Sequence, residues 1–218
     1  MPGLVAEAPI GACERPGNTL VGLRWHDAPI AHVAQRLGGP DPRWTSGYLS
    51  LKAPGSGALV WHQDWWCWDH PITRRRAPAQ IAVVCYLADK TAASGALRVL
   101  PGSHHRRHPL HDDDGCTADQ PDQQTLEGAA GDAFALDYRL LHGTHPNRSD
   151  EARDSVILNF TPDWAGLPAD LRSHLVGGLG LPTAEERPTT VEHVLPPAAP
   201  VHDLALNRCV PAGFSAIG

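Results

Sequence analysis

The most constraining feature of this sequence is a histidine and an aspartate two residues apart, in the run Val60-Trp61-His62-Gln63-Asp64. On an extended strand, side chains two residues apart project from the same face. An imidazole and a carboxylate on one face can bind one divalent metal ion as neighbouring ligands. Because such a pair recurs by chance in a chain with 13 histidines, it indicates a metal site only if a third ligand accompanies it.

A candidate third ligand is His142, far downstream of the pair. In a jelly roll, a gap of this length returns the chain to the opposite sheet, where a second histidine can face the first pair. Two histidines and one carboxylate on a triangular face form the facial triad of non-haem iron oxygenases. Arg153 begins the next expected strand, which would place its guanidinium beside the metal, and this rigid fork suits a carboxylate.

The remaining pattern predicts a mainly β protein. Glycine and proline, 21 of each, are typical of a turn-rich β architecture. Alternating or continuous apolar runs predict at least six short strands. They cover residues 47–53, 58–61, 81–87, 96–100, 133–141 and 155–160, whereas residues 103–130 have the polar composition of a loop. The pattern favours a sandwich or a jelly-roll barrel.

The length of 218 residues predicts one domain, 1–218. We expect a helical lead-in over residues 20–39 and a catalytic core over about 45–162. An irregular C-terminal extension is expected over 163–218, with a weak helix near 168–176.

Composition excludes several classes of protein. The net charge of −6 argues against a nucleic-acid partner, since such proteins usually carry a basic excess. The longest apolar run, residues 81–88, is far too short to span a membrane, and the first residues do not resemble a signal peptide. The five cysteines are scattered, which predicts no disulfide framework and a cytoplasmic location. The sequence carries no signal for an oligomeric state.

Three motifs follow one another along the chain: WHQD over residues 61–64, GALRVLPGSH over 95–104 and HGTHPNRSDEAR over 142–153. Together they resemble the phytanoyl-CoA dioxygenase-like family of Fe(II)- and 2-oxoglutarate-dependent oxygenases. The resemblance implies a double-stranded β-helix, a jelly-roll or cupin-like barrel with a few flanking helices. It also implies Fe(II) bound by His62, Asp64 and His142, with O2 and 2-oxoglutarate as co-substrates. Arg153 and Thr144 would then hold the distal carboxylate of 2-oxoglutarate.

The resemblance further implies hydroxylation of an aliphatic C–H bond in a small metabolite or natural-product intermediate, with release of succinate and CO2. Asp64 favours a hydroxylase over a halogenase, because a halogenase of this class needs a free metal position where the carboxylate sits. Desaturation, epimerisation and ring closure stay open. Two other functions are carried as alternatives: a cupin-like metalloenzyme that does not use 2-oxoglutarate, and a non-catalytic jelly-roll binding module.

Four other residues are candidates for a substrate pocket. Trp66 and Trp68 share the parity of His62 and Asp64, and their alternative role is aromatic packing at the barrel mouth. Arg98 either points into the barrel as a substrate contact or out into water. Lys52 either meets an anionic substrate or lies on the surface.

The remaining histidines have plainer interpretations. His145 competes with His142 as a ligand, but the spacing to Arg153 matches the family only from His142. A cluster of four histidines is expected to lie in a solvated loop near the mouth of the site rather than to bind a second metal: His104, His105, His108 and His111.

Overall fold

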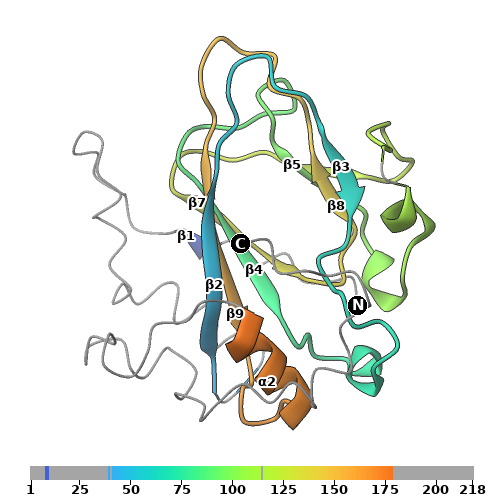
Figure 1. The fold of residues 1–218 in the computed structure, drawn as a ribbon. Helices are drawn as coiled ribbons and strands as arrows, with labels where there is room; N and C mark the ends of the chain where they lie inside the picture. Colours follow the sequence, from blue (N-terminus) through green and yellow to red (C-terminus); the bar gives the residue numbers. More distant parts are fainter. Residues whose placement is uncertain (1–7, 10–38, 40, 114, 179–218) are drawn as a thin grey trace, which may run out of the picture.

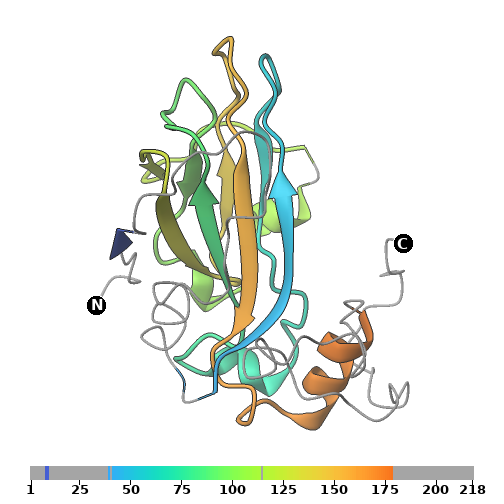
Figure 2. The same cartoon turned by 90° about the vertical axis from the view of Figure 1, so that its left-hand side faces the viewer.

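The strands of the computed structural model, which describes residues 8–9, 39, 41–113 and 115–178, form two antiparallel sheets. The strands are β1 (Ala8–Pro9), β2 (Arg43–Ser50), β3 (Leu59–His62), β4 (Ile81–Tyr86), β5 (Leu97–Val99), β6 (Gln124–Leu126), β7 (Asp132–Asp137), β8 (His142–Thr144) and β9 (Ser155–Thr161). Among the described residues, the larger sheet has the order β1-β7-β4-β9-β2 and the smaller β3-β8-β5-β6. Figure 1 shows the two sheets on opposite sides of a barrel. Figure 2 is turned so that the larger sheet faces the viewer, with the loops between strands extending above it. The predicted jelly-roll fold is confirmed.

The helical elements flank the sheets. Three 3₁₀ helices and one α-helix lie among the described residues that carry secondary structure: η2 (Pro71–Arg74), η3 (Ser103–His105), η4 (Pro109–Asp112) and α2 (Ala169–Gly178). Helix α2 lies where the weak helix was expected within the C-terminal extension. The expected helical lead-in lies outside the described residues, apart from Gly39. None of the described helices is long and apolar enough to cross a membrane.

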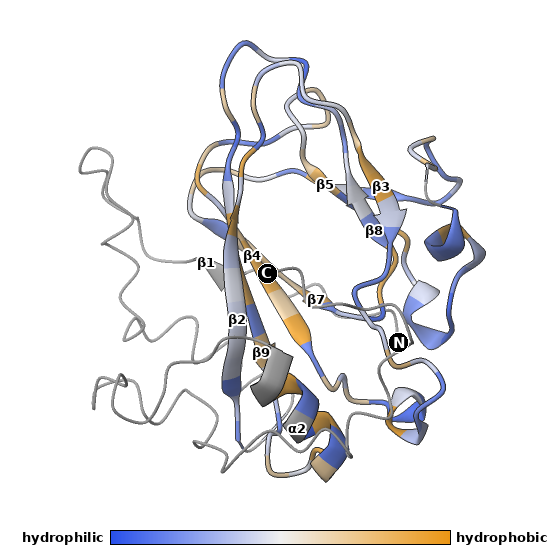
Figure 3. Ribbon diagram, viewed as in Figure 1, coloured by the Kyte–Doolittle hydropathy of each residue, from blue (hydrophilic) through white to orange (hydrophobic). Residues whose placement is uncertain are grey.

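Strand β4 is the centre of the core because all six of its residues are buried. Its even-numbered residues pack with Leu97 and Val99 of the smaller sheet, so this cluster fills the space between the two sheets. Its odd-numbered residues pack on the other face of the larger sheet with Val156, Leu158 and Phe160 of β9. Figure 3 shows β4 as one of the most apolar strands of the barrel. Burial on both faces explains the continuous apolar run in the sequence.

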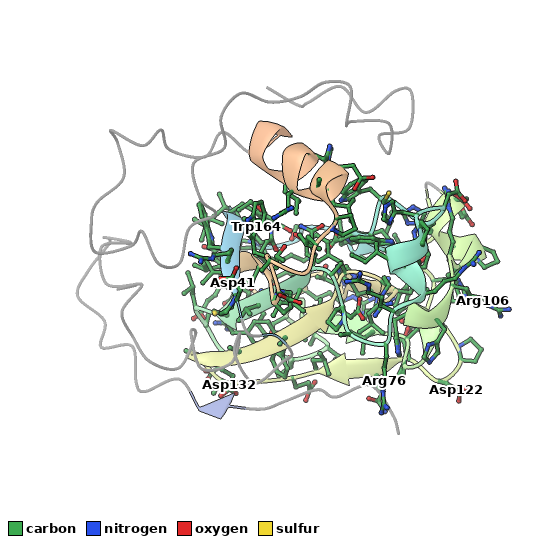
Figure 4. The ribbon with its side chains drawn as sticks, turned by 90° about the horizontal axis from the view of Figure 1, so that it is seen from below. Asp41, Arg76, Arg106, Asp122, Asp132 and Trp164 are labelled. Atoms are coloured by element: carbon green, nitrogen blue, oxygen red, sulfur yellow. The ribbon has the colours of Figure 1, made fainter. Side chains whose placement is uncertain are left out.

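A separate apolar cluster closes the end of the barrel beneath α2. It includes Trp65 and Ile72 from the segment after β3, and Leu171 and Leu175 from α2. Trp164 belongs to the same cluster, and its main-chain N–H donates to the carbonyl of Asp41 at 2.9 Å. In Figure 4, Trp164 lies near α2 on the side where Asp41 enters β2. This cluster packs against the segment that carries the predicted ligand pair.

Two sequence expectations about strands are wrong. The strand expected over 133–141 ends at Asp137, and a new strand, β8, begins at His142. A turn separates them because the Asp137 carboxylate accepts hydrogen bonds from both the main-chain N–H and the Nε–H of Arg139. Residues 124–126, expected in a loop, form β6 by pairing with β5.

Candidate metal centre and co-substrate pocket

The predicted metal ligands meet at one end of the smaller sheet. His62 ends β3, His142 begins β8, and the two residues are direct cross-strand partners. The earlier expectation that His142 faces the pair from the opposite sheet is therefore wrong, since both histidines lie on neighbouring strands of one sheet. Gly143 permits this close approach, because a Cβ there would lie 2.8 Å from the carbonyl oxygen of Leu59.

The carboxylate of Asp64 lies between the two imidazoles. Its Oδ1 is 3.6 Å from Nε2 of His62, and its Oδ2 is 3.6 Å from Nε2 of His142. The ring centroids of the histidines are 4.2 Å apart. One potential ligand atom from each of the three residues lies within 4.8 Å of the other two, and no other such group of three occurs among the described residues.

Each imidazole is oriented by a main-chain carbonyl. Nδ1 of His62 lies 2.9 Å from the carbonyl oxygen of Val60, and Nδ1 of His142 lies 2.9 Å from that of Leu140. Because a carbonyl only accepts, each Nδ1 carries a proton, and Nε2 is the ring atom that each histidine turns toward Asp64. Burial, reinforced by the neighbouring His142, lowers the pKa of His62 to about 4. Two imidazole lone pairs and a carboxylate converging in this way form a donor set that fits a divalent metal ion.

Two tyrosines that the sequence analysis did not single out lie close enough to this centre for the charge of Asp64 to affect their pKa values. Burial and the charge of Asp64 raise the pKa of Tyr48 to about 12, although 56% of the residue surface is exposed. Burial, Asp64 and Tyr48 raise the pKa of Tyr138 well above its usual value, and Ser46 hydrogen bonds to its hydroxyl. No motif in the sequence marked either residue.

The residues predicted to hold 2-oxoglutarate carry donors that no described residue uses. Arg153 pairs with Glu151 at 2.9 Å, but its buried Nε has no hydrogen-bond partner among the described residues. The Thr144 hydroxyl oxygen accepts from Nζ of Lys52 at 2.8 Å and from the N–H of Leu59 at 3.2 Å. Both acceptor contacts leave the Thr144 hydroxyl hydrogen available.

Lys52 is buried, with 8% of its surface exposed, so the surface interpretation of this lysine is wrong. Its Nζ also donates to the carbonyl of Gly57 at 2.7 Å. Burial and the charge of Arg98 lower the pKa of Lys52. The structure thus brings Lys52 to Thr144, one of the residues predicted to bind the co-substrate.

Arg98 does not lie in water either, because only 1% of its side chain is exposed. Its guanidinium stacks over the ring of Trp61 at 4.5 Å and bonds to the Asp119 carboxylate and the Thr117 carbonyl. These contacts bind the smaller sheet to the 117–119 segment. Its neighbours Leu97 and Val99 pack into the interior, so the alternation of a strand directs Arg98 to the other face.

Trp66 and Trp68 both pack against the apolar cluster beneath α2, together with Tyr138. The Trp66 ring lies 4.1 Å from that of His174, and its indole N–H donates to Oε1 of Gln80 at 3.4 Å. The buried Nε1 of Trp68 has no hydrogen-bond partner among the described residues. Both rings therefore pack on the side of the molecule that carries α2.

His145 does not belong to the group of three, and its Nε2 lies 2.9 Å from the hydroxyl of Thr125. The four histidines expected in a loop occupy η3, η4 and the residues around them. His111 accepts a hydrogen bond from the main-chain N–H of Gln63 through Nδ1. The described residues therefore contain no second metal cluster in this segment.

A jelly roll that gathers two histidines and one carboxylate at a strand end defines the class of non-haem iron dioxygenases. Residues 6–155 match the family described as phytanoyl-CoA dioxygenase (PhyH), and the chain belongs to this family. The predicted family is thereby confirmed.

Individual relatives agree with this assignment. Dioxygenase FUM3 of Gibberella moniliformis is 28% identical over 131 residues, which cover 58% of this chain and 41% of the relative. A probable alpha-ketoglutarate-dependent hypophosphite dioxygenase of Stutzerimonas stutzeri is 26% identical over 188 residues, or 76% of this chain and 64% of that protein. The L-proline trans-4-hydroxylase of Streptomyces griseoviridis is 27% identical over 159 residues, covering 61% and 59%. The chain thus spans between 41% and 64% of the length of these relatives.

Among solved structures, the nickel complex of the non-heme monooxygenase ThoJ is 26% identical with a TM-score of 0.50, covering 62% of this chain and 51% of ThoJ. The cofactors predicted here, iron and 2-oxoglutarate, are the ones named for a further relative, the iron/alpha-ketoglutarate-dependent dioxygenase ausU of Aspergillus calidoustus.

Proposed function

We propose that this chain is an Fe(II)- and 2-oxoglutarate-dependent dioxygenase that hydroxylates an aliphatic C–H bond of a small metabolite or natural-product intermediate, releasing succinate and CO2. The observation that carries the proposal is the convergence of two Nε2 lone pairs and one carboxylate within 4.8 Å. The core of the enzyme would span about residues 45–162, in a cytoplasmic protein. The names of relatives, a proline hydroxylase among them, support a small-molecule substrate.

The metal would be held by His62, Asp64 and His142. When bound, Fe(II) supplies the activation of O2 that amino-acid side chains lack. The protein contributes a fixed set of donors, because the carbonyls of Val60 and Leu140 prevent either imidazole from rotating away. The carboxylate of Asp64 fills the position that a halogenase leaves open for halide, which supports hydroxylation.

The distal carboxylate of 2-oxoglutarate would bind Arg153, Thr144 and Lys52. The unused Nε–H of Arg153 and the free hydroxyl hydrogen of Thr144 each offer one donor. An ammonium group has three N–H donors, and two of those on Lys52 are used by Gly57 and Thr144. Three donors without acceptors fit one carboxylate, which has about four lone-pair sites. Lys52 therefore serves the co-substrate in this proposal rather than the substrate.

The substrate would approach between the aromatic residues near Asp64. Tyr48 and Tyr138 come from different elements and both sense the charge of Asp64. Trp66 extends the aromatic surface from Tyr138 toward α2. Such a wall excludes water from the reacting C–H bond and favours a partly apolar substrate.

Anaerobic titration tests the co-substrate and the metal together. Addition of Fe(II) and then 2-oxoglutarate should produce a metal-to-ligand charge-transfer band, and its absence would overturn the proposal in favour of a non-catalytic binding module. A screen of substrate pools should then yield succinate together with a product heavier by one oxygen atom. Turnover that persists without 2-oxoglutarate would favour a cupin-like metalloenzyme instead.

A further inference from the structure

Gln63 lies in the sequence between the proposed ligands His62 and Asp64, but its side chain faces the opposite way. Only 3% of its surface is exposed, whereas His62 and Asp64 are half-buried. This alternation continues past the end of β3 and turns the Gln63 side chain away from the metal centre, into the protein. Its amide therefore contacts neither the metal nor a substrate.

The Gln63 amide is saturated by main-chain groups from two distant segments. Its Nε2 donates to the carbonyls of Ser103 at 3.2 Å, Arg106 at 3.1 Å and Arg139 at 2.6 Å. Its Oε1 accepts from the N–H of His108 at 2.8 Å. Figure 4 shows Arg106 at the outer edge of the molecule, on the segment that Gln63 fastens to the barrel.

Both segments are connected to the residues that come just before His142. Arg139 belongs to the turn between β7 and β8, the same turn whose Leu140 carbonyl orients the His142 ring. Ser103 accepts a hydrogen bond from the N–H of Leu141 through Oγ at 2.8 Å. Two chains of hydrogen bonds therefore connect the residue between His62 and Asp64 with the residues just before His142.

Arg139 is itself a rigid anchor for this connection. Its buried guanidinium donates to the carboxylate of Asp137 and to the carbonyls of Thr73 and Arg75. The carbonyl that receives Gln63 is consequently fixed in place. An amide suits position 63, because its two N–H groups face three carbonyls, one N–H being shared, and its oxygen accepts from one N–H.

We propose that Gln63 is a positioning residue of the metal centre, which sets the placement of the His62–Asp64 pair relative to His142 and fastens the histidine-rich segment 103–111 beside them. The proposal rests on the proposed function, since it assumes that these three residues bind the metal. It gives the histidine-rich segment a role as a clamp: His108 and His111 each hold Gln63 by one hydrogen bond.

The chain offers a matched control in Asn147. This amide is fully buried, and its Nδ2 likewise donates to three carbonyls, those of Lys52, Ala53 and Glu151. Its Oδ1 accepts from the main-chain N–H of Ser149. Replacing either amide by the corresponding acid turns a carboxylate oxygen toward carbonyl oxygens, but only Gln63 connects the proposed ligands.

The test compares Gln63→Glu and Asn147→Asp in the metal-free full-length protein, titrated with Co²⁺ alone at a temperature far below unfolding. Both variants should lose thermal stability. Only Gln63→Glu should weaken Co²⁺ binding, by about 10- to 100-fold as for other residues that orient metal ligands, and change the visible d–d spectrum of bound Co²⁺. A spectrum is informative here because a merely structural residue would lower stability and leave the coordination geometry unchanged.

Equal Co²⁺ affinity and identical spectra in Gln63→Glu and the wild type would overturn the proposal, as would an equal loss of affinity in Asn147→Asp. If Gln63→Glu does not fold, Gln63→Asn keeps a neutral amide but shortens its reach, and the same comparison applies to it. A wild-type protein that binds no Co²⁺ would instead overturn the proposed function.

Discussion

The guanidinium of Arg153 lies 2.9 Å from the carboxylate of Glu151, yet the buried Nε of the same arginine has no partner among the described residues. The side chain of Glu151 is 66% exposed, against 21% for Arg153. An exposed ion pair of this kind contributes little, about 0 to 1 kcal/mol. Glu151 therefore holds one side of the guanidinium without competing strongly for the inner side.

The two members of this pair should respond differently to substitution. Arg153→Ala is expected to weaken 2-oxoglutarate binding by at least about tenfold, since a hydrogen bond to a charged group is worth about 1.5–3 kcal/mol. Glu151→Gln should change it by less than about fivefold. Calorimetric titration of the Co²⁺-loaded protein measures both. Equal losses of Co²⁺ and 2-oxoglutarate affinity in Arg153→Ala would contradict the assigned role.

Lys52→Met tests the third donor proposed for the co-substrate. Methionine keeps the buried aliphatic volume but removes the ammonium that contacts Thr144, so 2-oxoglutarate affinity should fall by about tenfold while Co²⁺ affinity stays unchanged. The other lysine of the chain supplies the control. Lys90 is also buried and donates to a hydroxyl, that of Ser155, and Lys90→Met should alter 2-oxoglutarate binding less than Lys52→Met does. The reverse order would remove Lys52 from the pocket.

His142→Ala and His145→Ala separate the two candidate ligands of the downstream motif. Loss of a direct ligand should weaken Co²⁺ binding by more than about 100-fold, which exceeds the effect expected for residues that only orient ligands. His145 bonds to Thr125 instead, so His145→Ala should keep wild-type metal affinity. Titration with Co²⁺ and the d–d spectrum report both outcomes, and a larger loss in His145→Ala would reverse the assignment.

The sequence predicted which three side chains converge, but not the course of the chain that brings them together. Parity on an extended segment correctly put His62 and Asp64 on one side, because alternation survives even where the strand's hydrogen bonding stops at His62. The turn before His142 was hidden, since Leu140 and Leu141 continue the apolar run of β7. Its cause is a local side-chain bond from Arg139 to Asp137, which no hydrophobic pattern reports.

Contacts between residues far apart in the sequence could not be predicted from the hydrophobic pattern either. Tyr138, which follows the last residue of β7, comes close enough to Asp64 for that charge to raise its pKa. The proposed role of Gln63 depends on carbonyls 40 and 76 residues away in the sequence. Strand β6, only three residues long, is too short to show an alternation and forms because β5 offers it a partner. Lys52 was ambiguous because one lysine in an alternating run fits either face.

Lys90 makes the stability of the fold depend on pH in a defined window. Burial lowers its pKa from 10.5 to about 8, with Lys52 lowering it further and Asp154 opposing the shift. Between these two values the unfolded chain keeps a proton that the folded protein has lost, so the unfolding free energy rises with pH.

The variant Lys90→Met lacks this contribution to the unfolding free energy. The wild type should therefore gain stability relative to Lys90→Met between pH 8 and pH 10.5, on the order of 1 kcal/mol, because one pKa unit is worth about 1.4 kcal/mol and local relaxation reduces the full effect. Tyr86, whose ring lies 4.9 Å from Nζ, has a pKa of about 12 and titrates above this window. Urea unfolding of both proteins across the window measures the difference, and a flat or falling difference would show that Lys90 keeps its proton in the folded state.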